Sequence, residues 1–486
     1  MRERLSAVDT AWLRMDTPGN LMMICGVLLL SRPVGRARLT RVVEERFLRF
    51  DRFRQHPVER EGAAYWEAPA SFRLDEHVVP AKLPAPADRA RLQAYVSELM
   101  ATPLPAGRPL WQFHLVEHFE GGSAVIVRIH HCYADGIALV RVLLSMTDAG
   151  SDGPPAMPFA ASAPRSRDGD GDGDVLSQLF GPLHDIMRGA RRLVTGLIEK
   201  GAAVWDDPAQ AVALANQGGA FTAEVARLAL MGQDSATRFK GHVGVAKHVA
   251  WADPLSLDEV KAVGRALGAS VNDVLLACVA GALRDYLADH GDPVDDVMLR
   301  ALVPVNLRPM EEAYKLGNRF GLVFLELPLS IGNPVARLYA VRANMRALRD
   351  SYQPVLALGL LAAMGAGPRA LQDMLLETLA RNASAVMTNV PGPQQPLYLA
   401  GARIDGLMFW VPQSGDIGIG VSIISYAGKV QFGLVTDAGL CPDPQAIVAR
   451  FGDEFERLLL MSLLAPWDAG DLDPALADAL AQGQAG

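Results

Sequence analysis

Hydrophobic residues follow two periods along this chain, and together they predict strands alternating with amphipathic helices. Continuous apolar or β-branched runs, typical of buried strands, occur at 22–30, 111–117, 123–128, 298–309, 321–327, 383–388, 417–425 and 430–436. Apolar positions three and four residues apart predict helices at 39–50, 88–100, 137–147, 176–197, 208–231, 270–286, 355–366, 369–381 and 443–460. Strands that alternate with helices favour the α/β class.

The alternation stops once, and this break divides the chain. Residues 148–174 are dominated by Gly, Pro, Ser, Ala and Asp, a composition typical of a linker. We therefore expect an N-terminal lobe at 1–147, a linker with crossover helices at 148–241 and a C-terminal lobe at 242–486. Each lobe is predicted to contain a mixed β-sheet with helices. The basic helix at 175–200 fits a crossover between the lobes, and it also fits docking on a lipid surface.

Composition narrows the classes of protein. The chain has 486 residues, half of them hydrophobic, so two lobes can each bury a core. A net charge of −8 and the lack of a basic block argue against nucleic acid as a partner. Four scattered cysteines without a Cys-x-x-Cys pair suit a reducing cytoplasm. We expect no signal peptide and no bilayer-spanning helix, because the N-terminus is polar and the apolar runs are short.

The strongest chemical signal is His-His-Cys-Tyr-Ala-Asp-Gly at 130–136, directly after a predicted strand. Side chains on a strand alternate, so His130 and His131 are predicted to face opposite sides. We expect His131 to face a pocket with few core contacts, Asp135 to lie one turn away, and Gly136 to adopt a positive φ. A histidine beside a carboxylate is a general-base arrangement. A buried structural histidine pair and a zinc site are the alternatives, but no further ligand stands at zinc spacing.

Five motifs occur in an order that resembles one family. They are a Leu-Ser-Ala-Val-Asp start at 5–9, Pro-Leu-Trp at 109–111, His-His-x-x-x-Asp-Gly at 130–136, Asn-Asp at 272–273 and Asn-Val-Pro-Gly-Pro at 389–393. The sequence resembles the bacterial wax ester synthase/acyl-CoA:diacylglycerol acyltransferase family over nearly its whole length. The resemblance implies a chloramphenicol-acetyltransferase-like fold of two lobes with the active site in a tunnel between them.

The resemblance also implies a reaction. A fatty acyl group would pass from acyl-CoA, a cosubstrate, to a long-chain alcohol or diacylglycerol, without a metal or a permanently bound cofactor. His131 would accept the hydroxyl proton, in a catalytic motif with His130, Asp135 and Gly136. The Asn272 amide could donate to the oxyanion or could cap a helix, a role that Ser270 could also fill.

The remaining motif residues are expected to support this site. Arg308, as an Arg near a strand end, is the candidate partner of Asp135 across the lobes. Asn389 is expected near the CoA arm. Five further residues are interpreted as structural, in the sheet, at a helix start or in a turn: Pro109, Trp111, Asp273, Pro391 and Gly392.

Other functions remain open. Cys132 offers a covalent acyl-enzyme mechanism, although strand alternation turns it away from His131. A condensation-type or polyketide-ester acyltransferase would use a carrier-protein thioester, and a non-catalytic lipid-droplet protein is a third class. The expected location is the cytoplasm, either free or peripheral at the inner membrane or lipid inclusions.

Overall fold

The computed structural model describes residues 3–151, 231–306, 316–318, 320–349, 353, 357 and 381–464. Four sequence predictions lie wholly or almost wholly outside these residues. They are most of the linker, the crossover helices at 176–231, the Arg308 turn and the helices at 355–366 and 369–381.

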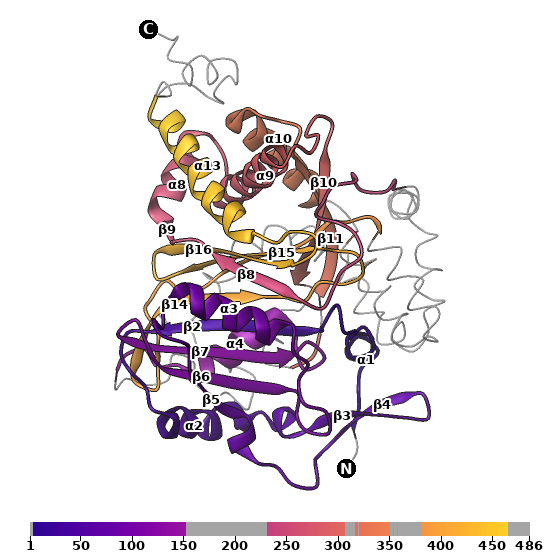
Figure 1. The fold of residues 1–486 in the computed structure, drawn as a ribbon, viewed down its shortest axis with the longest axis vertical. Helices are drawn as coiled ribbons and strands as arrows, with labels where there is room; N and C mark the ends of the chain where they lie inside the picture. Colours follow the sequence, from indigo (N-terminus) through magenta and orange to yellow (C-terminus); the bar gives the residue numbers. More distant parts are fainter. Residues whose placement is uncertain are drawn as a thin grey trace, which may run out of the picture.

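The N-terminal lobe is built on a six-stranded sheet with the order β13-β14-β2-β7-β6-β5 (Figure 1). Only β5 and β6 are parallel neighbours in this sheet. Its strands are β2 (Met23–Leu30), β5 (Val78–Ala81), β6 (Trp111–Phe119), β7 (Gly122–His130), β13 (Tyr398–Leu399) and β14 (Ala402–Trp410). The helices are α1 (Ala7–Arg14), α2 (Arg36–Glu45), α3 (Arg89–Met100) and α4 (Gly136–Met146). A small sheet adds β1 (Glu3–Arg4), β3 (His56–Arg60) and β4 (Ala63–Glu67).

The C-terminal lobe carries a seven-stranded mixed sheet, in which β10, β12 and β15 are parallel. Its strands are β8 (Lys247–Trp251), β9 (Leu255–Ser256), β10 (Met298–Asn306), β11 (Phe320–Pro328), β12 (Ala385–Pro391), β15 (Ile419–Tyr426) and β16 (Lys429–Asp437). Its helices are α8 (Leu257–Ala266), α9 (Val271–Asp289), α10 (Pro334–Arg349) and α13 (Pro444–Leu464). The predicted α/β class with two mixed-sheet lobes is confirmed.

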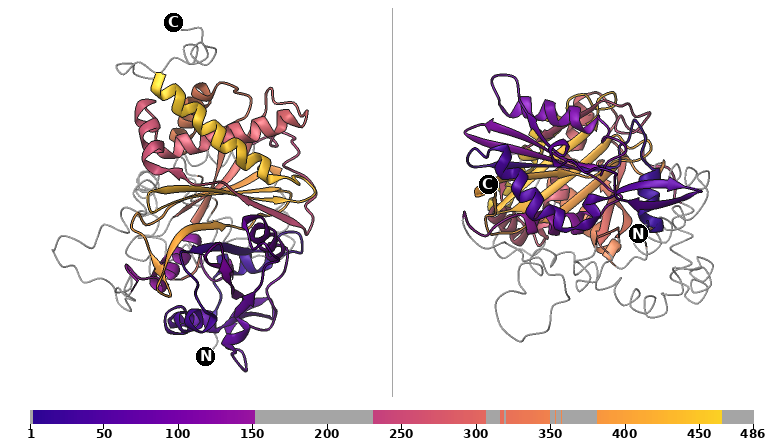
Figure 2. Two further views of the ribbon diagram at one scale, coloured as in Figure 1. Left: turned by 60° about the vertical axis from the view of Figure 1, so that its left-hand side comes forward. Right: turned by 90° about the horizontal axis from the view of Figure 1, so that it is seen from below.

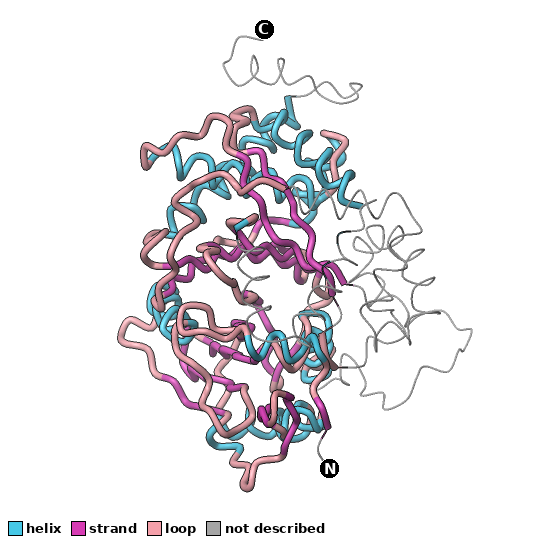
Figure 3. The backbone as a smooth tube through the Cα atoms, turned by 90° about the vertical axis from the view of Figure 1, so that its right-hand side faces the viewer, coloured by secondary structure: helices cyan, strands magenta, loops and turns pink. Residues whose placement is uncertain are grey.

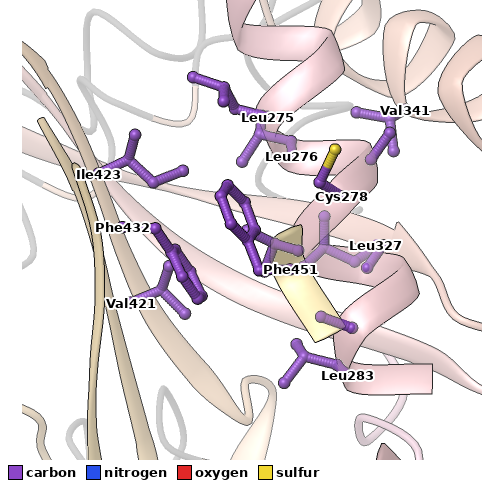
Figure 4. Close-up of a cluster of buried hydrophobic side chains, with 14 of the residues drawn as sticks. Leu275, Leu276, Cys278, Leu283, Leu327, Val341, Val421, Ile423, Phe432 and Phe451 are labelled. Carbon is purple, nitrogen blue, oxygen red and sulfur yellow. The ribbon is translucent and has the colours of Figure 1, made fainter. Parts of the chain in front are cut away.

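The helices of the C-terminal lobe all cover one face of its sheet, and the other face is turned toward the N-terminal lobe (Figures 1 and 2). Under the helices lies a core in which the rings of Phe432 and Phe451 stack at 4.0 Å (Figure 4). Figure 3 shows the two layers of strands separated along the long axis of the molecule. A shared apolar cluster joins the lobes, with Val27 and Ile126 from one sheet and Trp251 and Val435 from the other.

One segment contradicts the predicted domain boundaries. Residues 398–410 were expected in the C-terminal lobe, but β13 and β14 extend the sheet of the N-terminal lobe. Strand β14 pairs antiparallel with β2 from Cys25 to Leu30, and Figure 1 shows them side by side. The lobes are therefore not separate in sequence, because a strand from the second half completes the first sheet.

The predicted turn at Asn-Val-Pro-Gly-Pro is also wrong in its position. Strand β12 continues through Asn389 and Val390, and Pro391 is still paired with Ser425 of the parallel strand β15. Proline has no N–H to donate to a ladder, and β12 ends at Pro391. Hydrogen bonding to β15 continues at Gly392, whose N–H donates to the Ser425 carbonyl at 2.6 Å, and the bend follows at 394–395. A Cβ at Gly392 would overlap this carbonyl, so the close approach requires glycine.

Serine side chains cap several of the helices. Ser6 caps α1 by accepting the Asp9 N–H, and Ser270 forms a capping box with Asp273 at the start of α9. Among the described residues, no single helix is long and apolar enough to cross a bilayer. Taken together, helices α8 and α9 are long and apolar enough, but they are bent by 96° at the break between them.

Candidate active site

The motif loop joins the end of β7 to the start of α4. Strand β7 ends at His130, and the N–H of His131 donates to the Met22 carbonyl at 2.7 Å. Asp135 is the N-cap of α4, where its carboxylate accepts the Ala138 N–H at 2.9 Å. Gly136 was expected to have a positive φ, but it is the first residue of α4 and is not among the positive-φ glycines. The loop is thus held at one end by a backbone hydrogen bond and at the other by the Asp135 carboxylate.

Two aromatic side chains contact the His131 ring, and they also contact each other at 5.7 Å. Trp12 of α1 stacks on it with ring centroids 4.1 Å apart and planes 17° apart. Phe320, the first residue of β11, contacts it at 5.6 Å with the planes tilted by 49°. His131 is only 4 % exposed, so the expectation that it makes few core contacts is wrong. Helix α1 and strand β11 therefore place aromatic rings from both lobes on the proposed base.

Burial keeps both motif histidines neutral. Desolvation lowers the pKa of His131 to about 4, against the opposing effects of its own carbonyl, Asp135 and Asn318. The pKa of His130 falls to about 3, mainly by burial and then by repulsion from His131. Near pH 7 an unprotonated His131 can accept a proton, which is the first requirement of a general base.

A hydrogen-bonded bridge between the lobes fixes the backbone of His131. The Asn318 amide Nδ2 donates to the His131 carbonyl and to Asp9 Oδ1, each at 2.8 Å. The Asn318 backbone N–H donates to the same Asp9 oxygen at 3.1 Å. Asp9 and Asn318 are both buried, and burial raises the pKa of the Asp9 carboxyl. Next to them, the Gly317 carbonyl accepts the Asp135 N–H at 3.4 Å.

We expect replacement of Asn318 by alanine to lower the free energy of unfolding by about 1–3 kcal/mol, because the buried Asp9 carboxylate and the His131 carbonyl each lose the side-chain amide donor. The variant Asp9→Ala removes the other side of the same bridge. The two losses should not add in the double variant, since residues in one network are coupled. Urea unfolding of the four proteins measures this coupling, and strictly additive losses would show that the bridge does not connect the lobes energetically.

His130 has a different role from His131 in this geometry. Its Nδ1 accepts the N–H of Cys132 at 3.2 Å, and its Nε2 lies 3.9 Å from Asp16 Oδ1. The first contact closes the turn that follows β7. The side chain is therefore used to hold the loop, in agreement with the packing role predicted from strand alternation.

Cys132 lacks the features of a nucleophile. It is fully buried, and desolvation raises the pKa of its thiol well above the ordinary value. The carboxylates of Asp9 and Asp16 raise this pKa further. A thiolate is required for nucleophilic attack, so this environment disfavours the acyl-cysteine mechanism.

Trp111 is a core residue, as predicted. It is fully buried, pairs with Ile129 of β7 and donates its indole N–H to the Phe53 carbonyl at 2.8 Å. Pro109 precedes it in a tight turn, where its carbonyl accepts the Trp111 N–H at 3.0 Å. Both residues support the sheet next to the motif strand.

The structure brings Asn272 and Asn389 together. Asn389 Nδ2 donates to Asn272 Oδ1 at 3.0 Å, which joins the end of β12 to the first turn of α9. The cap of α9 is Ser270, so Asn272 is left available for another role. Asp273 is structural, since its carboxylate accepts the N–H and the hydroxyl of Ser270. An oxyanion role for Asn272 stays a prediction, as does a CoA contact for Asn389.

Two other predictions concern the partner of Asp135 and the binding of a metal ion. Arg308 lies outside the described residues, so its pairing with Asp135 stays a prediction. Within the described ranges, no group of three or more His, Cys, Asp or Glu side chains is arranged to hold a metal ion.

Two family models match most of the chain. Residues 5–275 match the wax ester synthase/diacylglycerol acyltransferase catalytic domain, and residues 316–459 match the WS/DGAT C-terminal domain. The chain belongs to the wax ester synthase/diacylglycerol acyltransferase family. It is therefore an acyltransferase of a family that uses acyl-CoA, and both the resemblance and the enzyme class predicted from the motifs are confirmed.

Curated relatives of this WS/DGAT family member agree. A protein named as a diacylglycerol O-acyltransferase from Mycobacterium bovis is 28% identical over 475 residues, covering 93% of this chain and 97% of the relative. Another from Mycobacterium tuberculosis is 27% identical over 485 residues, covering 94% and 90%.

Solved structures show the same fold. The wax ester synthase/diacylglycerol acyltransferase from Marinobacter aquaeolei has a TM-score of 0.65 at 21% identity, covering 95% of this chain and all of that one. The starter condensation domain of rhizomide synthetase has a TM-score of 0.57 at 16% identity, covering 97% and 98%. The condensation-type alternative is thus a distant likeness in fold, and the family match favours the main interpretation.

Sequence reasoning missed the four residues that surround and position His131 in this WS/DGAT chain: Asp9, Trp12, Phe320 and Asn318. The first of these residues belongs to the Leu-Ser-Ala-Val-Asp motif at 5–9, one of the five motifs evident in the sequence. Their meeting at His131 joins positions about 310 residues apart, which no local pattern reveals.

Proposed function

We propose that this chain transfers a fatty acyl group from acyl-CoA to the hydroxyl of a long-chain alcohol or of diacylglycerol, with His131 as general base. The observation that carries the proposal is a neutral, buried His131 in contact with the rings of Trp12 and Phe320, beside a cysteine whose pKa is raised. Such a site suits direct proton transfer between the two substrates.

The steps follow from the chemistry of the base. As the hydroxyl oxygen attacks the thioester carbonyl, His131 takes the hydroxyl proton and becomes an imidazolium. The negative charge then lies on the carbonyl oxygen, where an amide donor such as Asn272 would stabilise it. When the intermediate collapses, the C–S bond breaks and the imidazolium protonates the departing CoA thiolate. The face of Trp12 stabilises the transient positive charge on the ring.

Both proposed substrates carry long apolar chains that leave water readily. The proposal therefore includes a peripheral location at the inner membrane or at lipid inclusions, where such acceptors accumulate. Acyl-CoA is a substrate in this scheme, and no step requires a metal or a resident cofactor.

The test is a reaction of purified protein with palmitoyl-CoA and either hexadecanol or diolein, following free thiol and neutral lipid together. We expect one ester formed per thiol released, with at least one acceptor. The variant His131→Gln, with a side chain of similar size that is not basic, is the matched control and should form little ester. Thiol release without ester formation would mean that the protein is a hydrolase and would contradict the proposal.

A further inference from the structure

The C-terminal lobe contains an apolar pocket, of which the steps above use only Asn272. It lies between the β11-β10-β12 part of the sheet and helices α9 and α10, with an empty volume of about 600 Å³ including the solvent at its mouth. Nine apolar residues and two asparagines line it: Leu276, Val303, Pro304, Val305, Val323, Leu325, Met345, Leu348, Met387, Asn272 and Asn389.

The polar and the apolar lining residues occupy different parts of this pocket. Asn272 and Asn389 are partly exposed and hydrogen-bonded to each other, so they form the mouth. Val305 is the lining residue nearest the carboxyl end of β10, and Asn389 lies near the carboxyl end of the parallel strand β12. In open α/β sheets, ligands enter at this end of the strands.

The opposite end of the pocket is buried and apolar. Leu325 lies two residues beyond Val323 along β11, on the same face of the strand, and is fully buried. The Asn344 side chain donates to the Glu326 carbonyl at 2.9 Å, which places the adjacent Met345 at the level of Leu325. Leu325 and Met345 therefore form the floor. Met345 is unbranched and flexible, so a floor of this kind adapts to the end of a chain.

We infer that this pocket holds the hydrocarbon chain of the acyl thioester and that its floor limits the length of that chain. The inference rests on the proposed function and names a subsite of it. The hydrogen-bonding groups at the mouth indicate which of the two substrates the pocket binds. With Asn272 Oδ1 occupied by Asn389, the Asn272 NH₂ group has no acceptor among the described residues and can only donate. A thioester carbonyl only accepts, whereas an alcohol must donate its proton to His131.

The mouth is also connected to the proposed base. Val305 is followed by Asn306, whose backbone pairs with Phe320, the residue that contacts His131 at 5.6 Å. Phe320 belongs to the apolar core of the N-terminal lobe and the pocket to that of the C-terminal lobe. In this arrangement the thioester carbonyl would lie at the end of the β10–β11 strand pair. Its acyl chain would extend into the pocket on one side of these strands, and His131 would lie on the other side.

Variants at two depths test the inference through chain-length profiles of the purified full chain, with acyl-CoAs from C8 to C20 and one fixed alcohol. Val323→Phe adds a ring halfway along the pocket and should shift the preferred acyl chain to shorter lengths. Each methylene that no longer fits should lower kcat/KM by about fourfold, as expected from the transfer free energy of one methylene. Met345→Ala opens the floor and should shift the preference to longer chains, whereas Met345→Leu keeps the volume and should leave the profile unchanged.

The reciprocal profile, with one fixed acyl-CoA and alcohols of increasing length, should not move in either variant. A shift of the alcohol profile in place of the acyl profile would overturn the inference, and so would unchanged acyl profiles in folded variants. If Val323→Phe does not fold, Leu348→Phe adds the same ring at a partly exposed wall. A wild-type protein that forms no ester from any pair of substrates would contradict the proposed function itself, which separates the two failures.

Discussion

Replacing His131 with glutamine is expected to lower kcat by a factor of about 10² to 10⁴, the usual contribution of a general base. Glutamine fills a similar volume against Trp12 and Phe320, so the folded state should persist. The variant His131→Ala should lose activity to the same extent, but it should also unfold at a lower temperature because it leaves a cavity in a buried site. The measurements are steady-state release of CoA and calorimetry on the same preparations.

The neighbouring histidine provides the matched control. In His130→Asn, the amide oxygen can replace Nδ1 as the acceptor of the Cys132 N–H. This variant should therefore keep the turn. Its kcat should stay within about tenfold of the wild-type value, a much smaller decrease than the loss of a general base would cause. If His130→Asn is inactive and folded while His131→Gln still turns over, His131 is not the base.

The pH dependence of kcat/KM should identify the same group. The base must be neutral, and burial lowers the pKa of His131 to about 4. Activity should therefore stay level as the pH falls from neutrality and decline only as it passes through about 4. An acid limb near the ordinary histidine value of about 6.5 would show that the working base is less buried than His131 is here.

The second large effect is expected in the core of the C-terminal lobe, from a buried ion pair. Arg337 of α10 and Glu454 of α13 form this pair, and both side chains are only 1% exposed. Arg337 also donates to the carbonyls of Ala277, Ile331 and Gly332. Loss of one partner leaves a buried charge, so Glu454→Gln or Arg337→Met should lower the free energy of unfolding by about 3–5 kcal/mol.

The pair also has a predictable pH dependence. Burial already raises the pKa of Glu454, and without Arg337 it should rise further. The folded Arg337→Met protein then binds a proton that the unfolded chain has released. Its stability relative to the wild type should therefore recover as the pH falls through the folded pKa of Glu454.

Arg457→Met is the control for this pair, because Arg457 contacts the same carboxylate at 2.6 Å but is half exposed. Its loss should cost less than about 1 kcal/mol. Equal losses for Arg337→Met and Arg457→Met in urea unfolding would contradict a dominant role for the buried partner.

Local patterns were sufficient for much of the fold. The motif loop, the cap at Ser270 and the strands β15 and β16 were predicted because each depends on neighbouring residues. Helix α10 also carried a local signal that was overlooked. Asn333 accepts the N–H groups of Val335 and Ala336 as a cap, and Pro334 is the first helical residue.

Long-range contacts could not be predicted in this way. The pairing of β14 with β2 depends on which sheet edge is free in the folded protein. The sequence of neither strand contains this information. The same reason explains why Asn318 was not recognised as a support of His131. Burial of His131 was also missed, because the rings that cover it come from α1 and β11.

The central claim is direct transfer of the acyl group to the acceptor, with His131 as base and no acyl-enzyme. The most direct measurement is rapid mixing of stoichiometric amounts of the protein with palmitoyl-CoA in the absence of any alcohol, followed by mass spectrometry of the intact chain. The account predicts no burst of free CoA and an unmodified protein, with CoA release beginning only when hexadecanol is added. A burst of one CoA per protein, together with an acyl group on Cys132, would contradict it.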